Sequence, residues 1–382
     1  MTYASPLKLE AKANLLPFRR ALLAWYRKHH RQLPWRQTHD PYAVWVSEIM
    51  LQQTQVATVI KYYLRFLARF PTVSSLAAAA EQEVLTLWSG LGYYRRARQL
   101  HAAAKQIVQE NHGIFPNTLD EVRALPGVGR YTAGAILSFA YGQRAPILEA
   151  NTLRLYCRLI GLREDPKSAA SQQHLWSFAE HLLPKAGTDI GQVNQALIEL
   201  GSLICSPKQP DCTACPVKRF CVADYDGLQA EIPRAAAAPV ITPLHHALIV
   251  IQRGKKTLMR QNPAGRWWEG LWDFPRVDLT ELGWHQEFDL AARKPMTQIA
   301  LVESAMQQSL GLELRETTCE YLKTIRHGVT RYRISLHCFR AHLQSPACLP
   351  PEHTWQWVDL ALEPQVPLTS TAQKLRRWLP RL

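Results

Sequence analysis

Four cysteines that lie close together near the middle of the chain are the feature that most constrains its fold. They stand at Cys205, Cys212, Cys215 and Cys221, with the spacing C-x6-C-x2-C-x5-C. Four thiolates in so short a segment can hold one tetrahedral zinc ion or a [4Fe–4S] cluster, or they can be unrelated buried thiols. Many zinc sites combine two C-x2-C pairs, and this segment has one. The pattern therefore favours a [4Fe–4S] cluster, with a structural role because no redox motif accompanies it.

The composition limits the class of protein. The chain has 382 residues, of which 47% are hydrophobic, and this is enough for the cores of two or three domains. Its net charge of +14 suits a polyanionic partner such as DNA or RNA, and also an ordinary basic enzyme surface. No run of about 18 apolar residues and no signal-type N-terminus is found, so we expect a cytoplasmic protein, nucleoid-associated if bacterial.

Hydrophobic periodicity divides the chain into two domains. Helical spacing begins at Asp40-Pro41 and covers residues 42–51, 55–69, 81–89, 94–111, 118–124, 130–141, 150–161, 171–183 and 189–204. Residues 227–243 are rich in Ala and Pro and are expected to form a linker. Strand patterns follow over 247–251, 256–260, 319–326 and 332–339, with one helix over 297–310. We therefore predict an all-α domain over 1–226 and a smaller α/β domain over 244–382.

A glycine-containing turn between two predicted helices is a candidate anion site. The segment LPGVGRYTA begins at Leu125, and Gly127 and Gly129 are expected to let the backbone adopt positive φ values. Such a turn directs backbone N–H groups and a helix N-terminus at an anion, for which a DNA phosphate is the natural choice. The alternative is a plain interhelical turn with no ligand.

Several further segments carry a family resemblance. They are LPWR (33–36), SEIMLQQTQV (47–56), GLGYY (90–94), LPGVGRYTAGAI (125–136), NQALIELG (194–201) and the four cysteines. In this order they resemble the MutY family of helix–hairpin–helix DNA glycosylases, which remove adenine opposite 8-oxoguanine. The match runs from about Trp25 to Cys221, and the rest of the chain resembles, more loosely, the Nudix-like domain of the same family. The resemblance implies a monomer that binds double-stranded DNA with an 8-oxoguanine·A or G·A mispair and carries a [4Fe–4S] cluster.

The resemblance also implies two catalytic carboxyl groups. Breaking an N-glycosidic bond needs one protonated acid for the leaving base and one ionised group near the cationic sugar. Glu48 matches the family's general acid, and its apolar neighbours are expected to raise its pKa. The second carboxylate departs from the family, which has Asp-Gly-Asn where this chain has Glu149-Ala150-Asn151. The longer side chain is expected either to be accommodated or to weaken the activity, because misplacement by about 1 Å can cost on the order of 100-fold in rate.

The remaining roles in the first domain are carried over from the same motifs. Tyr131 stands where strand-cleaving relatives have a lysine that forms an imine with the sugar, which a tyrosine cannot do. We therefore predict a monofunctional glycosylase, in which Tyr131 and Asn151 support the second carboxylate. Base flipping is expected to use Gln53 and Tyr93 as wedges.

Two further sets of side chains complete the predicted DNA site. Arg36 and Glu199 are expected to line the adenine pocket. Arg95, Arg96 and Arg98 are expected either to contact phosphate or to form a solvated helix face.

The second domain is expected to bind and not to hydrolyse. The segment GLWDFP (270–275) resembles a Nudix-like domain, but residues 304–311 lack the carboxylates with which a Nudix hydrolase binds metal. The family reads 8-oxoguanine with a Phe-Ser-His loop, for which the candidate here is Ile325-Arg326-His327. His327 is therefore the predicted reader of the lesion, with a structural histidine as the alternative.

These inferences lead to one functional hypothesis with three alternatives. We expect an adenine glycosylase acting on adenine mispaired with 8-oxoguanine or guanine. The alternatives are an endonuclease III-like enzyme for oxidised pyrimidines, a non-catalytic or detuned mispair-binding protein, and a thymine mismatch glycosylase. Tyr131 and the second domain argue against the first alternative, whereas Glu149 is the reason for considering the second.

Overall fold

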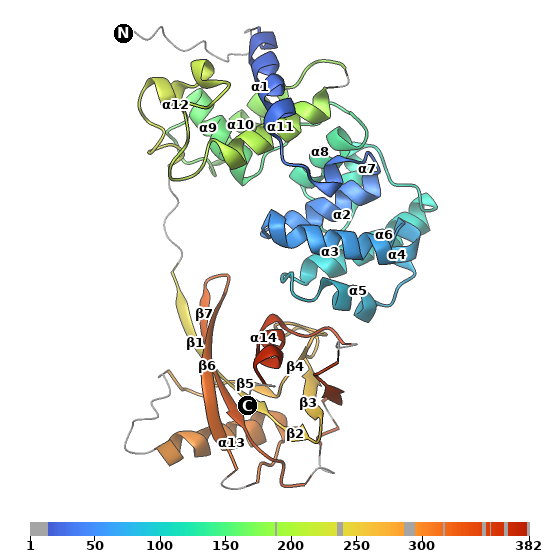
Figure 1. Ribbon diagram of the computed structural model, residues 1–382, viewed down its shortest axis with the longest axis vertical. Helices are drawn as coiled ribbons and strands as arrows, with labels where there is room; N and C mark the ends of the chain where they lie inside the picture. The colour runs from blue at the N-terminus through green and yellow to red at the C-terminus, as the bar shows by residue number, and fades with distance from the viewer. Residues whose placement is uncertain are drawn as a thin grey trace. The chain divides into compact units, whose positions relative to one another are not determined.

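The computed structural model describes residues 14–187, 189–234, 240–285, 295–315, 318–345, 349–351, 353–362 and 366–379 (Figure 1). By their internal contacts these form two compact units. The first unit is Met1–Ala79 with Arg95–Ala237, and the second is Ala80–Tyr94 with Ala238–Leu382. The segment Ala80–Tyr94, which the sequence assigns to the helical domain, therefore groups with the C-terminal part of the chain.

The first unit is helical throughout its described part. Its helices are α1 (Leu16–His29), α2 (Pro41–Leu51), α3 (Val56–Arg69), α4 (Val73–Ala77), α6 (Arg95–Asn111), α7 (Leu119–Ala124), α8 (Arg130–Phe139), α9 (Ala150–Ile160), α10 (Ala169–Leu182), α11 (Ile190–Leu203) and α12 (Val222–Tyr225). Every helix that the periodicity predicts in this unit is present, and its ends lie within about two residues of the predicted ends. Helices α1, α4 and α12 were not assigned individually. Among the described helices, none has the length and apolar character that crossing a bilayer requires.

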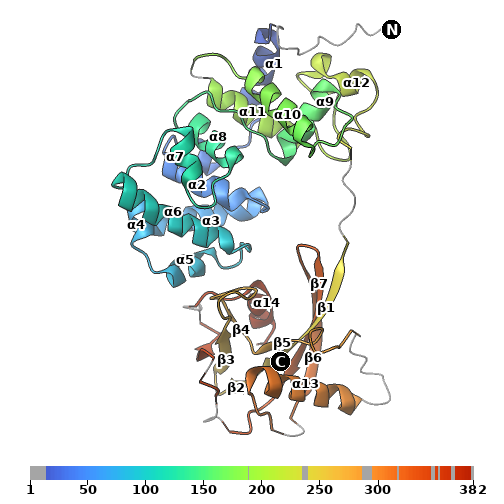
Figure 2. The ribbon, with the colours of Figure 1, turned by 180° about the vertical axis from the view of Figure 1, so that it is seen from behind.

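Helix α2 forms the centre of one half of this unit. The side chain of Asp40 caps it by accepting hydrogen bonds from the backbone amides of Tyr42 and Ala43, as the Asp-Pro start predicts. All its residues from Tyr42 to Met50 are buried, because α3, α6 and α8 pack around it (Figures 1 and 2). A helix that is apolar on every side can exist only inside such a shell.

The other half of the unit has its own core, built by α1, α9, α10 and α11. Its fully buried side chains include Phe18, Tyr156 and Leu197. Ile232 also packs into this core, and its carbonyl accepts a hydrogen bond from Arg158. The predicted linker is therefore shorter than residues 227–243, since its first part is packed and a strand begins at Thr242; residues 235–239 lie outside the described part.

The glycine turn between α7 and α8 differs in one respect from the expectation. Gly127 has a φ of +79°, and a Cβ there would lie 2.9 Å from the Cβ of Gln99. Gly129 is the N-cap of α8 with a φ of −90°, which any residue can adopt, and a Cβ there would meet nothing within 4 Å. The expectation of positive φ was right for Gly127 and wrong for Gly129.

Two four-stranded sheets form the centre of the second unit. The first has the order β5 (Arg276–Asp278), β1 (Thr242–Val250), β7 (Tyr332–Arg340) and β6 (Glu320–Val329), with β1 and β7 parallel. The second joins β2 (Gln252–Arg253), β3 (Lys256–Gln261) and β4 (Trp272–Asp273), and β8 (Trp355–Asp359) pairs with β3. Strand β1 alternates between two cores, with Ile249 in one and Leu248 in the other.

Three helices accompany these sheets. Helix α13 (Pro295–Leu310), predicted over 297–310, ends at Gly311, which has a φ of +63°. Helix α14 (Ser370–Trp378) packs near β4, and α5 (Glu81–Trp88) is the helix of the segment Ala80–Tyr94. Strands β2, β4, β5 and β8 and helix α14 were not predicted, because most are too short to show a period.

The close approach of α8 to the chain before α9 yields a prediction for stability. A Cβ at Gly134 would lie 2.3 Å from the carbonyl oxygen of Pro146. We expect Gly134→Ala to lower the free energy of unfolding by about 1–3 kcal/mol in urea denaturation followed by circular dichroism. Gly129→Ala is the matched control and is expected to be near neutral. Equal stability of the two variants would contradict the packing described here.

Candidate active site

A cavity of about 490 Å³ in the first unit brings together most of the predicted catalytic side chains. Its walls come from the segment before α2, from α2 and the turn after it, and from α8, α9 and α11. The predicted site residues that line it are Arg36, Glu48, Gln53, Tyr131, Glu149 and Asn151. Residues separated by more than 100 positions in the chain therefore face one space of a size suited to a nucleobase with its sugar.

Glu48 is the buried carboxyl group of this cavity. It lies on the buried helix α2, its residue is 5% exposed, and one of its oxygens accepts a hydrogen bond of 2.8 Å from the hydroxyl of Tyr131. Burial raises the pKa of Glu48 to about 7, with a further increase from the negative charge of Glu149, against the lowering effect of the Tyr131 bond. A carboxyl group with this pKa holds its proton in a large fraction of molecules at neutral pH, as a general acid must.

Glu149 uses its longer side chain to cap α9. One carboxylate oxygen accepts hydrogen bonds of 2.9 Å from the backbone amides of Asn151 and Thr152, and the other accepts 3.2 Å from the Asn151 side chain. Burial raises the pKa of Glu149 by more than these donors lower it, so that the pKa lies above the usual value of a glutamate. The carboxylate thus folds back onto the start of its own helix, where backbone amides and the helix dipole favour its ionised form.

Tyr131 differs from its predicted role. Its hydroxyl bonds to Glu48, and not to the second carboxylate. Asn151 keeps the predicted role, because its side-chain amide donates to Glu149.

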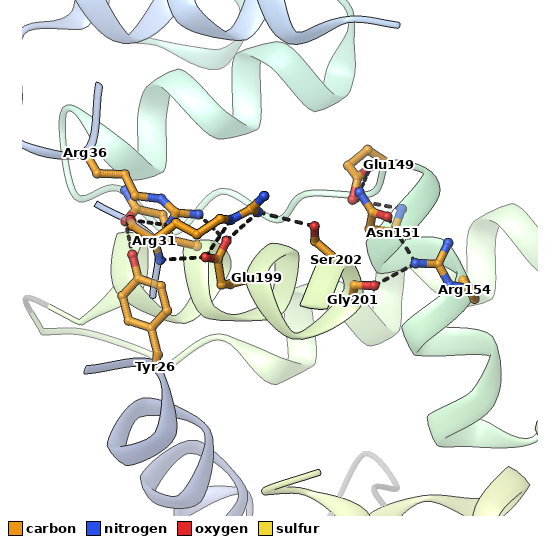
Figure 3. Close-up of polar contacts among 10 residues, drawn as sticks. Tyr26, Arg31, Arg36, Glu149, Asn151, Arg154, Glu199, Gly201 and Ser202 are labelled. Atoms are coloured by element: carbon orange, nitrogen blue, oxygen red, sulfur yellow. Dashed lines mark hydrogen bonds and ion pairs between the residues drawn. The ribbon is translucent and has the colours of Figure 1, made fainter. Parts of the chain in front are cut away.

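A buried arginine continues the contacts of Asn151 (Figure 3). The guanidinium of Arg154 donates several hydrogen bonds. Three of their acceptors are the side-chain oxygen of Asn151 at 3.0 Å, the carbonyl of Gly201 at 2.7 Å and the carbonyl of Cys205 at 2.8 Å. Asn151 is therefore held by a fixed charge from one side while it donates to Glu149 on the other. The same guanidinium reaches the first cysteine of the four-cysteine loop.

Arg36 lines the cavity, whereas Glu199 does not. The carboxylate of Glu199 contacts the guanidinium of Arg36 (Figure 3). Glu199 is 0% exposed, so its carboxylate does not form the wall that the sequence predicts. It accepts 2.7 Å from Arg36 and three hydrogen bonds of 2.8–2.9 Å from Arg31. Burial raises the pKa of Glu199, but these donors outweigh that effect and lower it to about 2. Glu199 is thus an anchor that fixes two arginines at the cavity.

The turn after α2 presents Gln53 to the solvent. Gln53 is exposed and has a φ of +55°, which is uncommon for a residue with a side chain. The buried guanidinium of Arg96 holds this turn by donating to the carbonyls of Ile49, Met50 and Gln52. Arg96 is 8% exposed, so the expectation that it contacts phosphate or a solvated face is wrong. It caps the helix that carries Glu48.

The four cysteines line one small cavity next to α9. Arg158, on the same helix as Arg154, donates 3.3 Å to the sulfur of Cys205 and 2.7 Å to the carbonyl of Ser206. Such a donor suits a negatively charged sulfur ligand. Among the described residues, no three His, Cys, Asp or Glu side chains form a ready site for a single ion.

Two predicted contacts to the lesion lie in the second unit. His327 is in β6, opposite Ile334, and neither of its buried ring nitrogens has a hydrogen-bond partner. Burial, with the positive charge of Arg276, lowers the pKa of His327 to about 4, so the ring is neutral at pH 7. Tyr93 has a φ of +49° and is 47% exposed.

The sequence reading missed three arginines of the site, namely Arg31, Arg154 and Arg158. Arg154 and Arg158 stand four residues apart on a helix, each flanked by apolar residues, in the segment LRLYCRL. Charged residues at helical spacing inside an apolar stripe indicate buried arginines that need several acceptors. That signal was available, but the acceptors are backbone carbonyls, which the sequence does not mark.

Comparisons with known proteins assign both parts of the chain. Residues 46–181 match the model of the HhH-GPD superfamily of base excision DNA repair proteins, and residues 246–377 match that of the NUDIX domain. An adenine DNA glycosylase of Rattus norvegicus is 34% identical over 96% of this chain and 74% of the relative. The chain belongs to the adenine DNA glycosylase family.

A second adenine DNA glycosylase agrees with this assignment, and one solved structure agrees with a glycosylase fold for about half of the chain. The adenine DNA glycosylase of Buchnera aphidicola subsp. Schizaphis graminum is 37% identical over 68% of this chain and 75% of its own length. The solved structure of a thermostable thymine-DNA glycosylase is 28% identical, with a TM-score of 0.51, over 55% of this chain and 95% of that chain. The predicted fold class, a helical glycosylase domain followed by a Nudix-like domain, is confirmed.

The burial of Glu199 leads to a second prediction. Glu199→Gln leaves Arg31 and Arg36 without their shared carboxylate, and breaking a buried ion pair costs about 3–5 kcal/mol. We expect this loss in the free energy of unfolding measured by urea denaturation. Glu180→Gln is the matched control, because Glu180 is half exposed where it pairs with Arg144 and such surface pairs contribute about 0–1 kcal/mol. A loss as small as that of the control would show that Glu199 does not anchor the arginines.

Proposed function

We propose that this protein is a monofunctional adenine glycosylase that removes adenine paired with 8-oxoguanine or guanine in double-stranded DNA. We further propose that it acts as a monomer in the cytoplasm. The observation that carries the proposal is Glu48, a buried carboxyl group with a pKa raised to about 7 in a cavity that it shares with Glu149. The names of its relatives support adenine as the base.

The proposed reaction begins with a proton transfer from Glu48. The everted adenine accepts the proton at N7, and the bond between N9 and C1′ of the sugar breaks with its electron pair moving to the base. Protonation is needed because an adenine anion is a poor leaving group. Glu48 is left as a carboxylate, and the hydroxyl of Tyr131 stabilises that charge through the hydrogen bond it already donates.

The sugar left behind is a cation, and Glu149 is the group that stabilises it. The backbone amides at the start of α9 and the Asn151 amide favour its ionised form, against burial, which raises its pKa. In that form Glu149 places a negative charge near the developing cation. A water molecule then attacks C1′ and gives up a proton to the Glu48 carboxylate, which restores the acid and leaves an abasic site. Tyr131 offers no amine for an imine with the sugar, so the strand stays intact.

The DNA contacts are proposed from the positions of individual side chains. Gln53 and Tyr93 are exposed with positive φ values, a geometry that suits side chains inserted between bases. The neutral ring of His327 has two unpaired nitrogens, which suits hydrogen bonding to the edge of an oxidised guanine. The amides at the start of α8 suit a phosphate, and the net charge of +14 suits the duplex as a whole.

A [4Fe–4S] cluster is proposed for the four-cysteine loop. Cys205, Cys212, Cys215 and Cys221 line one cavity, and Arg158 donates to the first of these sulfurs. When bound, the cluster would tie the loop together by four iron–sulfur bonds. Arg154 and Arg158 then join that loop to α9, whose first turn holds Glu149.

One alternative function is favoured by a specific observation. Because Glu149 is engaged as the cap of α9, it could be held too far from the sugar cation, and the protein would then bind the mispair without efficient base release. Glu149→Asp separates the two cases. Rapid release by the wild type shows that the cap is also a catalytic group, whereas slow release that Asp accelerates shows a detuned enzyme.

The general-acid role of Glu48 gives a third prediction. We expect Glu48→Gln to lower single-turnover adenine release from an 8-oxoguanine·A duplex by about 100- to 10,000-fold without weakening duplex binding. The wild-type rate is expected to fall above about pH 7, because the acid form of Glu48 is lost as pH rises through its pKa. Retained release by the glutamine variant, or a rate that does not fall above pH 7, would remove Glu48 from this role.

The cluster proposal gives a fourth prediction. We expect Cys212→Ser to lose the visible absorption of the cluster and part of the affinity for duplex DNA, because the loop loses one of four ligands. Cys319→Ser is the control, since Cys319 is a buried free thiol in the second unit. Iron and sulfide analysis of the purified protein is the direct measurement, and a colourless wild type that contains zinc would overturn the proposal.

A further inference from the structure

The glycine-rich loop that carries Tyr93 is bonded to the C-terminal part of its own unit. The hydroxyl of Tyr94 donates 3.1 Å to the carbonyl of Leu368, and the hydroxyl of Ser89 donates 3.0 Å to the same carbonyl. The side-chain amide of Gln373 donates 2.6 Å to the Ser89 hydroxyl. These bonds join positions that are more than 270 residues apart in the chain, and all lie within the second compact unit.

The loop itself has a fixed shape. Gly90 and Gly92 have φ values of +105° and +75°, and the indole of Trp88 donates 3.1 Å to the carbonyl of Gly92. The hydroxyl of Tyr94 also accepts a hydrogen bond of 3.1 Å from the amide of Gly90. Tyr94 is therefore buried inside the turn, whereas Tyr93, the next residue back, is left 47% exposed.

The carbonyl of Leu368, which accepts the hydrogen bonds of Ser89 and Tyr94, is also held in a fixed position. Leu368 is 1% exposed and pairs with Trp272 of β4 in an isolated bridge. Thr369 caps α14, and Gln373 lies one turn into that helix. An acceptor that is held by a buried β-bridge and a capped helix restricts the position of its donor more than an acceptor on a mobile loop would.

We propose that Gln373 and the carbonyl of Leu368 position Tyr93 for insertion into DNA, acting through Ser89 and Tyr94. This inference rests on the proposed function, which assigns Tyr93 and His327 to the lesion. Both belong to the second unit. The second unit would then carry Tyr93 and His327 as one body, whereas Gln53 and the base-release chemistry belong to the first unit. Gln373, Ser89 and Tyr94 are positioning residues in this scheme.

A double-mutant cycle tests the proposal. We expect Gln373→Ala to weaken binding to an 8-oxoguanine duplex that carries an uncleavable adenine analogue by about two- to tenfold, the usual loss for one hydrogen bond. If Gln373 acts through Tyr93, the same change made in the Tyr93→Ala protein costs less than about twofold. An equal loss in both backgrounds would mean that Gln373 has a general structural role and would overturn the proposal. Gln307→Ala, at an exposed glutamine of α13, is the matched control.

Amide hydrogen exchange of the full-length protein without DNA tests the contact separately from the function. Gln373→Ala and Tyr94→Phe are expected to speed exchange in residues 89–94, whereas Gln307→Ala leaves it unchanged. Unchanged exchange in both variants overturns the positioning role, whatever the activity. If the wild type neither binds nor cleaves the mispair but exchange is faster in the variants, the proposed function is wrong, whereas the contact of Gln373 with the loop is confirmed.

Discussion

The proposed chemistry depends on one carboxyl group being kept away from water. Free glutamate is ionised at neutral pH, and burial is the main cause that raises the pKa of Glu48 to about 7. That burial comes from α2, which is surrounded by α3, α6 and α8 and carries no exposed face between Tyr42 and Met50. The cap at Asp40 and the guanidinium of Arg96 satisfy the two ends of the helix. The packing of this core thus also raises the pKa of Glu48.

Helix α9 has a comparable double use. Its first turn holds Glu149 and Asn151, and Arg154 and Arg158 extend from later turns to the loop of the four cysteines. A carboxyl group, two buried guanidinium groups and the cysteine loop are therefore all tied to one rigid helix. Because the helix is stiff, the position of the loop and the orientation of Asn151 are set together.

The sequence predicted the order of the helices and several of the side chains that line the cavity. It did so because long amphipathic helices show their period and because catalytic motifs keep their residue types. It did not predict that Glu149 caps its own helix, since glutamate is not among the residues preferred at an N-cap and the cap depends on the direction of two backbone amides. Nor could it predict that Glu199 lies behind the wall and not in it, because only packing decides which end of an ion pair faces the cavity.

The placement of Ala80–Tyr94 in the second unit has a consequence for how this protein can be divided. The chain passes from one unit to the other three times, so the two units are not successive modules. A cut in the stretch before β1 would separate Ser89 and Tyr94 from their hydrogen-bond partners Leu368 and Gln373. Exchange of C-terminal parts between relatives would likewise place a foreign surface against Ser89 and Tyr94. Recombination near residue 237, where the second unit resumes, is therefore constrained by the segment Ala80–Tyr94, which is encoded far upstream.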